Sequence, residues 1–298
     1  MRLWLIYRQK DVKKNEWYIK EYQTIGLELG FMVELILAED ITVVCKMGGY
    51  DFYHRGQITQ LPDAAIIRTI DPKLSKVLEA AKIRCFNSAQ ISELCNDKAK
   101  TCMEVAKLNI AMIPTTPCRR EDLEHTIGKV AQELVIKTVD GHGGQEVFLL
   151  PSVSLSDPEQ VRLRRELVLD CLQKTNSDFV IQPLIGLRHQ DLRVYVLGKQ
   201  ILCAILRTSS SGFKANYSLG GLVTKYELSE KEKEIVFTIL TRFDVDLVGI
   251  DFLVSDDGEL IFNEMEDVVG TRMLYECTDI NLVREYLIYI KSQLLSTM

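Results

Sequence analysis

Apolar positions in residues 1–90 form short runs that alternate with longer amphipathic stretches. Short apolar runs bounded by glycine or polar residues are typical of buried strands, and apolar residues recurring once per helical turn are typical of helices. Strands and helices that alternate over short connections predict a small parallel α/β domain. Residues 48–56 (GGYDFYHRG) interrupt the alternation and are expected to form a loop. The expected strands are 3–7, 33–37, 64–68 and 83–86, and the expected helices are 15–30 and 72–82.

The pattern changes after residue 90. Asn96 is expected to cap a helix that runs to about Leu108, because asparagine is a preferred N-cap residue. The prolines of IPTTP (113–117) then require an extended chain. Hairpin-like patterns dominate toward the C-terminus, so the later part of the chain is expected to be antiparallel. The expected elements are strands on either side of a glycine break within 129–150, extended chain at 179–185, hairpins at 191–207 and 248–266, and helices at 158–174, 229–243 and 280–295.

These changes predict three regions in an α/β (α+β) protein. They are an N-terminal α/β domain at 1–90, a central region with the glycine break at 91–180, and a C-terminal region with the second hairpin at 181–298.

The glycine break lies in residues 135–150, VIKTVDGHGGQEVFLL. Glycine allows a loop to close its backbone N–H groups around an anion, but glycine is equally at home in a plain hairpin turn. The segment alone is compatible with both structures. Its one lysine, Lys137, lies in the strand-like run before the break.

Composition narrows the function without naming it. The chain has 298 residues and a formal net charge of −6, which disfavours a nucleic-acid partner because such a surface would be basic. No apolar window is long enough for a membrane helix, and the N-terminal apolar run is too short for a signal peptide. Eight scattered cysteines without a C-x-x-C pair fit reduced thiols, so a cytoplasmic protein without a structural zinc site is expected.

The most informative segment is GIDFLVSDDGELIFNEMED (249–267). Asp257-Gly258 between alternating apolar residues is a strong signal for a two-residue hairpin loop. That loop would place Asp251 directly opposite Glu264, with Glu266 on the same face. Like charges in opposed positions are destabilising, so these three carboxylates require a cation. Because all the ligands are oxygens, Mg²⁺ or Mn²⁺ is favoured.

Apolar neighbours distinguish this site from the alternative, a solvated acidic face on an edge hairpin. In the same register Leu253 would face Phe262, and Ile250, Phe252 and Met265 also flank the carboxylates. Such flanks favour a buried metal site over a solvated face.

This hairpin closely resembles the metal-binding segment of the ATP-grasp ligases, in which an Asp on one strand and a Glu-x-Asn on the next bind two Mg²⁺ ions. Glu266 stands where the family usually has Asn, and residues 267–276 lack the usual N-x-x-P-G continuation. Other segments follow in the family's order and are similar to its RimK-like and glutathione-synthetase-like carboxylate–amine ligase branch. They are Asn96-Asp97-Lys98, Ile113-Pro114-Thr115, Lys137 with Gly141-His142-Gly143-Gly144, Gln182-Pro183-Leu184-Ile185, and Asp191-Leu192-Arg193 with Arg207, Asn216 and Gly220-Gly221.

The resemblance implies an ATP-grasp fold, with an N-terminal Rossmann-like domain and two α+β lobes that enclose the nucleotide. It also implies an enzyme that uses ATP with Mg²⁺ (or Mn²⁺) to phosphorylate a carboxylate, after which an amine displaces the phosphate. An amino acid or a small peptide would be the acid, no membrane or nucleic acid would take part, and a homodimer is compatible with the pattern.

Site residues follow from the resemblance residue by residue. Asp251, Glu264 and Glu266 would bind metal, and Arg193 and Arg207 would be catalytic. Asn216, Gly220 and Gly221 would contact the substrate. Arg68 and Arg272 are further substrate candidates because of their positions, Arg68 at the end of the strand 64–68 and Arg272 just past the metal-binding strand. ATP would contact Lys98, Lys137, Gly141, His142, Gly143, Gly144, Gln182, Pro183, Leu184, Ile185 and Asp191.

Several roles stay open at the level of sequence. Arg193 would stabilise an oxyanion or else form a surface pair with Asp191. Arg207 would lie on the face opposite Arg193 if Gly198-Lys199 formed a two-residue loop, and a bulge would bring it to the same face. Arg272 would clamp a carboxylate or form an exposed ion pair.

Two other functions are compatible with the same motifs. A small-molecule kinase on this fold would pass the phosphate to a hydroxyl group. A non-catalytic nucleotide-binding regulatory protein would have lost part of the site, but both lysines, Arg193 and the three acidic residues are present.

Overall fold

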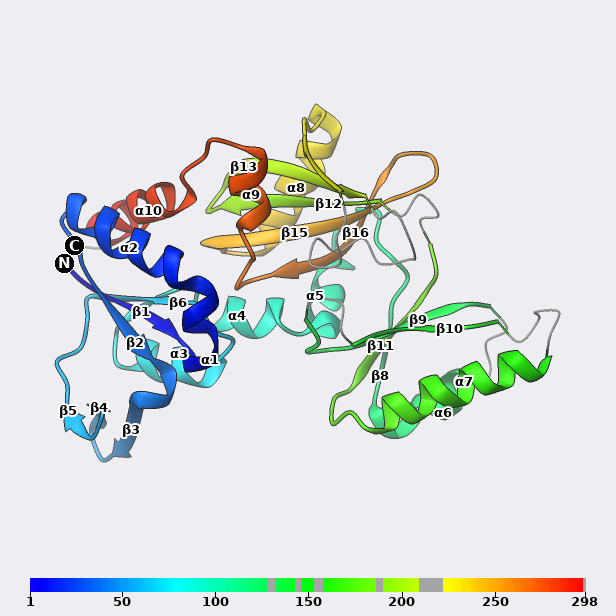
Figure 1. The fold of residues 1–298 in the computed structure, drawn as a ribbon, viewed down its shortest axis with the longest axis horizontal. Helices are drawn as coiled ribbons and strands as arrows, with labels where there is room; N and C mark the ends of the chain where they lie inside the picture. The colour runs from blue at the N-terminus through cyan, green and yellow to red at the C-terminus, as the bar shows by residue number, and fades with distance from the viewer. Residues whose placement is uncertain (128–131, 143–145, 153–157, 186–189, 209–221, 297–298) are drawn as a thin grey trace.

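The architecture comes from a computed structural model that describes residues 1–127, 132–142, 146–152, 158–185, 190–208 and 222–296. Within these residues the chain forms an N-terminal parallel sheet, a small antiparallel sheet beside it, a central sheet and a C-terminal sheet (Figure 1). None of the described helices is long and apolar enough to cross a bilayer.

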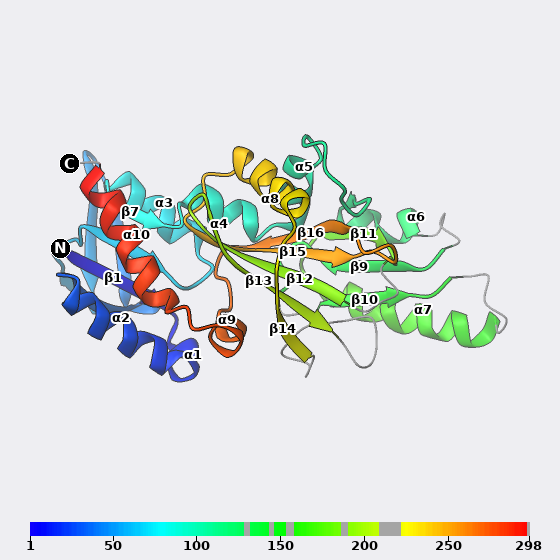
Figure 2. The ribbon, with the colours of Figure 1, turned by 90° about the horizontal axis from the view of Figure 1, so that it is seen from above.

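The N-terminal sheet is parallel, as the alternating pattern predicts. Its strand order is β2-β1-β6-β7, and residues 3–6 of the central strand β1 are fully buried. The C-terminal helix α10 packs beside α2 on this sheet, so the two termini lie at the same end of the molecule (Figures 1 and 2). The elements are β1 (Arg2–Tyr7), α1 (Gln9–Val12), a short 3₁₀ helix (Lys13–Asn15), α2 (Glu16–Glu28), β2 (Met32–Leu37), β6 (Ala64–Ile67), α3 (Pro72–Ala80), β7 (Arg84–Phe86) and α10 (Leu282–Ser296).

The expectation of a loop at 48–56 is wrong. Strand β4 (Gly49–His54) pairs antiparallel with β3 (Ile41–Lys46), and β5 (Gln57–Ile58) follows it. Gly48 has a φ of +88°, a conformation that suits the tight turn between β3 and β4. The buried Phe52 packs onto the core beneath the N-terminal sheet, which gives this hairpin the apolar contact that a free hairpin lacks.

The helix expected from Asn96 begins one residue later. Asp97 is its N-cap, and the Asp97 carboxylate accepts a hydrogen bond of 3.0 Å from the Lys100 backbone N–H. Asn96 instead ends a preceding helix. Lys98 is consequently the first residue of α5. The two helices are α4 (Ala89–Cys95) and α5 (Lys98–Val105).

The central sheet has the order β10-β9-β11-β8, and all its pairings are antiparallel. Helices α6 and α7 cover one face of it and contribute to its apolar core (Figure 1). The elements are β8 (Thr116–Cys118), a 3₁₀ turn (Arg120–Asp122), α6 (Leu123–Ile127), β9 (Leu134–Thr138), β10 (Val147–Leu150), α7 (Pro158–Gln173) and β11 (Phe179–Pro183).

The C-terminal sheet has the order β14-β13-β12-β15-β16. Strand alternation divides its residues between two faces. Leu192, Val194 and Val196 of β12 pack against α8, while Arg193 lies on the other face, where the charged residues gather. The elements are β12 (Gln190–Leu197), β13 (Gln200–Thr208), β14 (Leu222–Tyr226), α8 (Glu230–Arg242), β15 (Leu247–Val254), β16 (Leu260–Glu266) and α9 (Arg272–Cys277).

A buried polar side chain, Asn87, joins the N-terminal sheet to the hairpin of β15 and β16. Asn87, directly after β7, donates to the backbone carbonyl of Leu247 (2.7 Å) and to the Asp267 carboxylate (2.6 Å). Its oxygen accepts from the backbone N–H groups of Asp246 and Leu247. A single side chain therefore ties the start of β15 to the residue that follows β16.

Asp246 lies beside this junction. Its Oδ1 accepts hydrogen bonds from Arg84 (2.8 Å) and from the Tyr289 hydroxyl (2.9 Å). Its Oδ2 is buried and has no hydrogen-bond partner among the described residues. Burial raises the pKa of Asp246 to about 6.

The raised pKa makes the junction more stable when Asp246 is protonated. Because the folded pKa lies above the unfolded value, this stability is full below pH 4 and is lost as the pH rises through 6. Relative to Asp246→Asn, the natural protein should therefore gain about 2 kcal/mol in its free energy of unfolding between pH 7.5 and pH 4. Urea unfolding of both proteins across this range measures the difference. Parallel pH profiles would show that Asp246 does not titrate in this way.

Candidate active site

Three carboxylates meet on the β15–β16 hairpin. Asp251 lies opposite Glu264 and Gly249 lies opposite Glu266, which confirms the expected pairing of Asp251 with Glu264. Each carboxylate offers an oxygen within 4.8 Å of the others. Asp251 is buried, while the two glutamates are partly exposed. The donor set consists only of carboxylate oxygens and suits a hard divalent cation.

The expected hairpin loop is nevertheless wrong. Strand pairing ends at Val254 and Leu260, so the loop has the five residues 255–259 instead of Asp257-Gly258 alone. Phe262 therefore pairs with Phe252 instead of Leu253. A bulge at Asn263 then shifts the register by one residue and restores the pairing of Asp251 with Glu264.

Arg193 forms ion pairs with two of these carboxylates, Asp251 and Glu266. Its Nε and one terminal nitrogen bind both oxygens of Asp251 at 2.7 and 2.6 Å, and its other terminal nitrogen contacts Glu266 at 2.8 Å. The expected alternative, a surface pair with Asp191, is wrong because Arg193 is buried and Asp191 pairs elsewhere. Gly249 allows Val269 to pack closely beside this arginine, since a Cβ at Gly249 would lie 2.6 Å from the Val269 side chain.

Arg207 joins the same face because of a second bulge. Gly198-Lys199 does form a two-residue loop, and Leu202 is an extra residue in β13 that shifts the register between Tyr195 and Val196. Arg207 consequently lies opposite Asp191 and binds both its oxygens, and it also contacts Asp251 at 2.8 Å. Burial raises the pKa of Asp191 to about 6, against the effect of the Arg207 charge.

Two lysines approach Glu264 from the central region. Lys98 Nζ lies 3.4 Å from the Glu264 carboxylate, and Lys137 Nζ donates to the Asn263 side chain at 2.8 Å. Burial raises the pKa of Glu264, but the charges of Lys98 and Lys137 outweigh it and hold that pKa below its usual value. Burial lowers the pKa of Lys137. These contacts bring α5 and β9 onto the acidic hairpin, which is the hairpin of β15 and β16 with Asp251, Glu264 and Glu266.

The described part of the glycine break lies at the same place. Lys98 Nζ donates to the Gly141 carbonyl, and His142 lines the cavity that Glu266 borders. A Cβ at Gly141 would lie 2.2 Å from Thr138 Oγ1, so this close approach requires glycine. Gly143 and Gly144 lie outside the described residues. The two strands that flank the break, β9 and β10, pair with each other.

The segment expected to contact adenine lies at the end of β11. Gln182 is buried and donates to Thr115 Oγ1 at 2.9 Å, and Pro183 ends the strand. The Leu184 N–H donates to the Glu133 carbonyl at 3.3 Å, and Ile185 follows it. Here the chain leaves the central sheet toward β12.

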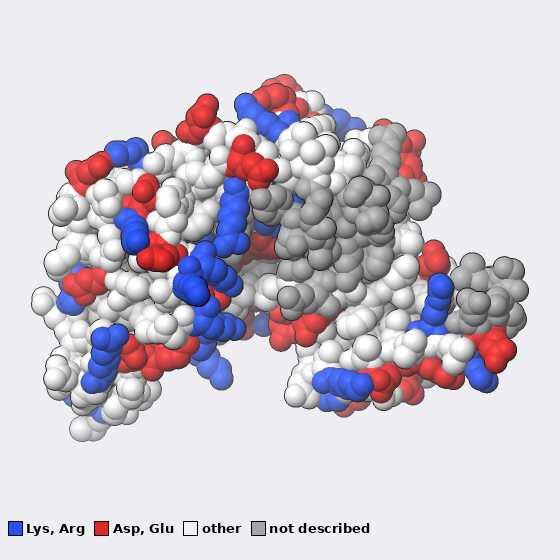
Figure 3. All heavy atoms as spheres, viewed as in Figure 1, with Lys and Arg blue, Asp and Glu red and all other residues white. Residues whose placement is uncertain are grey.

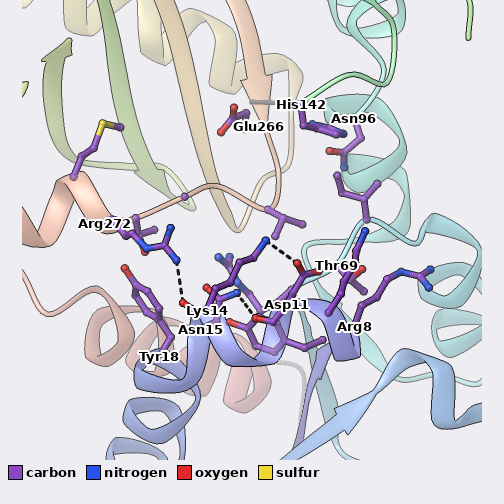
Figure 4. A pocket seen from close by; sticks show the side chains of 18 of the residues that line it. Arg8, Asp11, Lys14, Asn15, Tyr18, Thr69, Asn96, His142, Glu266 and Arg272 are labelled. Carbon is purple, nitrogen blue, oxygen red and sulfur yellow. Dashed lines mark hydrogen bonds and ion pairs between the residues drawn. The ribbon is translucent and has the colours of Figure 1, made fainter. Parts of the chain in front are cut away.

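A cavity of about 490 Å³ opens between the N-terminal sheet and the acidic hairpin (Figure 4). Glu266 and His142 border one side of it, and Lys14 and Arg272 border another. Arg68 also lines it and donates to the Val269 carbonyl at 3.1 Å. The cavity therefore brings Arg68 and Arg272, both predicted to contact substrate, onto the space that Arg193 and Arg207 also line.

Arg272 does not form an ion pair with any described carboxylate. Its guanidinium donates to the Lys14 backbone carbonyl at 3.0 Å, which joins α9 to the segment after α1. Asn216, Gly220 and Gly221, the remaining residues predicted to contact substrate, lie outside the described residues.

Sequence reasoning missed three residues of this site. Asn263 is the bulged residue of β16 and binds Lys137, and its position within the N-E-M-E motif was the available signal. Lys10 and Lys14 line the cavity from the turn after β1. Their spacing of four residues places them on one helical face, but nothing in the sequence shows that this face borders the cavity.

Comparisons with known proteins agree with this arrangement. Residues 95–290 match the family described as the RimK-like ATP-grasp domain. A probable alpha-L-glutamate ligase from Mannheimia succiniciproducens is 26% identical over 221 residues, which are 73% of this chain and 70% of that protein. N-acetylaspartylglutamate synthase A from Homo sapiens is 28% identical over 228 residues, which are 72% of this chain and 56% of that longer protein.

A solved structure shares the fold. The ATP-grasp ligase PsnB, complexed with a phosphomimetic variant of its minimal precursor, Mg and ADP, superimposes with a TM-score of 0.66 at 15% sequence identity. The match covers 98% of both chains. At this identity the likeness concerns the arrangement of the sheets.

Proposed function

The chain belongs to the RimK-like ATP-grasp family and is an ATP-dependent carboxylate–amine ligase, and we propose that it joins an anionic amino acid of the glutamate type to the carboxyl group of a second small substrate. In this reaction class a carboxylate oxygen attacks the γ-phosphorus of ATP and ADP leaves. The amine nitrogen then attacks the acyl carbon, and phosphate leaves with formation of the amide and loss of a proton.

Asp251, Glu264 and Glu266 would hold Mg²⁺ (or Mn²⁺) in this proposal. A carboxylate can accept about four hydrogen bonds or metal contacts, and Glu264 and Glu266 use few of theirs within the described chain. When bound, the metal supplies positive charge that neutralises the transferring phosphoryl group. Asp251 is committed to two arginines, so it also fixes the orientation of the cluster.

Lys98 and Lys137 would contact the ATP phosphates, and Gly141 with His142 would cover them. Both lysines reach the hairpin from the central region, and neither has a close carboxylate partner other than Glu264 among the described residues. An unbalanced pair of buried or half-buried ammonium groups favours a polyanion such as triphosphate. Residues 182–185 would contact the adenine, with Asp191 acting through Arg207.

Arg193 is the residue we assign to the reacting carboxylate. It lines the cavity and is held by Asp251 and Glu266, so its orientation is fixed before substrate binds. A preorganised guanidinium stabilises the negative charge that develops on the acyl oxygen. Arg207 contributes a second positive charge at the same carboxylate of Asp251.

The observation that supports an anionic amino acid as the amine substrate is the absence of a carboxylate partner for Arg68 and Arg272 among the described residues. Both line the cavity, and neither pairs with a carboxylate in the described part of the chain. A guanidinium without a carboxylate partner beside a cavity is well suited to a substrate carboxylate. The two arginines would bind the two carboxylates of a glutamate-like molecule and leave its amine free to react.

A substrate screen with Arg272→Ala tests the proposal. Wild-type enzyme should release ADP and form an amide with L-glutamate or L-aspartate and with no neutral amino acid. Arg272→Ala should lower kcat/KM for the anionic amino acid by about 10- to 100-fold, because two charge-assisted hydrogen bonds are lost. Coupled ADP detection and mass spectrometry of the product measure both effects.

The matched control is Arg284→Ala, which removes an exposed arginine of α10 that pairs with Glu28 away from the cavity. It should leave the kinetics unchanged. Equal use of neutral and anionic amino acids would contradict the assignment of Arg68 and Arg272. A stable phosphoester in place of an amide would indicate a kinase.

A further inference from the structure

The cavity is basic although the protein is acidic. Residues that line it include seven with cationic side chains and two with carboxylates, whereas the whole chain has a formal net charge of −6. Figure 3 shows Lys and Arg atoms gathered in a band across the middle of this face. The cations are Arg8, Lys10, Lys14, Arg68, Arg193, Arg207 and Arg272, and the carboxylates are Asp11 and Glu266.

Most of these cations already have a defined role or partner. Arg193 and Arg207 bind the carboxylates of the active site, and Arg8 binds Asp71 at 3.0 Å. Arg68 and Arg272 are assigned above to the amino acid. Lys14, whose side chain is 62% exposed, forms an ion pair with Asp11 at 2.7 Å. Lys10 remains, with no carboxylate within 4.0 Å in the described chain. The cavity thus holds more positive charge than one amino acid balances.

Lys10 and Lys14 are placed to act together. Lys10 lies in α1, and Lys14 follows in the 3₁₀ helix that continues it. Residues four apart on a helix share a face, and both lysines line the cavity while the intervening Lys13 does not. Arg272 fixes this segment by binding the Lys14 carbonyl (Figure 4).

These lysines are separate from the phosphate-binding residues. Lys98 and Lys137 lie on α5 and β9 and do not line this cavity, whereas Lys10 and Lys14 do, and Lys14 lies on the wall opposite Glu266 (Figure 4). The charge on that wall therefore addresses something other than the triphosphate. A cavity of about 490 Å³ accommodates small molecules and excludes a folded partner.

We propose that Lys10 and Lys14 form a second anion subsite, and that the acid activated by this enzyme is a small dicarboxylate. One carboxylate reacts beside Arg193 and Glu266, and the other is bound by the two lysines. This inference rests on the proposed ligase function, and it makes the α1 segment the part of the N-terminal domain that selects the acid.

Glutarate and its monoamide, glutaramate, are suitable probes because glutarate is symmetric and the monoamide retains one reactive carboxyl. With L-glutamate as the amine, wild-type enzyme should prefer glutarate to glutaramate by about tenfold or more in kcat/KM. The double variant Lys10→Ala/Lys14→Ala should lose that preference, because its kcat/KM for glutarate falls to about that for glutaramate. Succinate and adipate in the same assay measure the spacing that the subsite prefers.

Lys13→Ala/Lys20→Ala is the matched control, since it removes two exposed lysines from the same region that do not line the cavity. It should keep the wild-type preference. Equal use of glutarate and glutaramate by wild-type enzyme would overturn the inference while leaving the ligase function intact. The inference would also be overturned if the Lys10/Lys14 variant lost activity on an acidic peptide but kept its activity on glutarate. That result would indicate a peptide as the acid.

Direct binding separates this inference from the proposed function. Calorimetric titration of glutarate into the enzyme with ADP and Mg²⁺ should show binding that the Lys10/Lys14 variant weakens about tenfold and the Lys13/Lys20 variant does not. This outcome would support the subsite even if no amide formed with any amine tested. Binding of equal strength in all three proteins would refute it.

Discussion

Replacing Glu264 with glutamine is expected to lower Mg²⁺-dependent ATP turnover by about 10³-fold. Glu264 contributes one of the three clustered carboxylates, and within the described chain its side chain pairs only with Lys98, at 3.4 Å. Glutamine keeps the size of the side chain but removes the charge that a divalent cation requires. ADP release at increasing Mg²⁺ concentrations measures the effect, and thermal unfolding should show a stability close to that of the wild type.

Asp251→Asn is a less direct test of the proposed metal site. Asp251 is buried and neutralises Arg193 and Arg207, so its replacement would leave two buried guanidinium groups undercompensated. A loss of activity in that variant would therefore have two causes that this test does not separate, weaker metal binding and a destabilised fold.

Glu259→Gln is the matched control for Glu264→Gln. Glu259 lies in the loop of the same hairpin, is exposed, and pairs with Lys231 on the surface. Its replacement should change neither turnover nor Mg²⁺ dependence, because exposed ion pairs contribute little. Full Mg²⁺-dependent turnover in Glu264→Gln would exclude Glu264 as a metal ligand.

Asn87→Ala is expected to lower the free energy of unfolding by about 3–5 kcal/mol. Asn87 is buried, and its amide makes hydrogen bonds to the backbone at Asp246 and Leu247 and to the Asp267 carboxylate. Alanine would leave the backbone groups of Asp246 and Leu247 without this partner and would remove one donor from the buried Asp267 carboxylate. Urea unfolding at neutral pH measures the loss.

Asn87→Asp distinguishes this hydrogen-bond loss from a simple cavity. Aspartate fills the same space, but it cannot donate to Leu247 or to Asp267 and would place a second carboxylate beside the first, so it should be no more stable than the alanine variant. Asn281→Ala removes an exposed asparagine that accepts from the Arg284 N–H, and should cost only about 1 kcal/mol. A stable Asn87→Ala protein would show that the junction is held by other contacts.

Much of the fold follows from local pattern. The parallel N-terminal sheet and the two C-terminal hairpins were predictable because each strand carries its own apolar alternation, although the loop of the β15–β16 hairpin is longer than its turn residues predicted. The hairpin at β3 and β4 was not, because its apolar positions are sparse and only Phe52 is deeply buried. Its stability comes from packing on a neighbouring sheet, which local pattern does not contain.

The clustering of the three carboxylates was predictable from the sequence, whereas most of the contacts around them were not. Asp251, Glu264 and Glu266 follow from one hairpin, and their clustering agrees with the geometry. The partners of Arg193 and Arg207 depend on the register of β12 with β13 and β15, which no single segment specifies. The lysines after β1 and the Asn87 junction depend on contacts between residues far apart in the sequence, so the sequence offered no signal for them.

The two bulges make the site depend on the number of residues in its strands. Asn263 and Leu202 are each one residue more than the partner strand has, and they bring Glu264 opposite Asp251 and Arg207 opposite Asp191. A homologous chain lacking either extra residue could retain every charged side chain and still present it on the wrong side of the sheet. When relatives are aligned, a one-residue gap inside β13 or β16 would therefore be as informative about activity as the loss of an arginine or a glutamate.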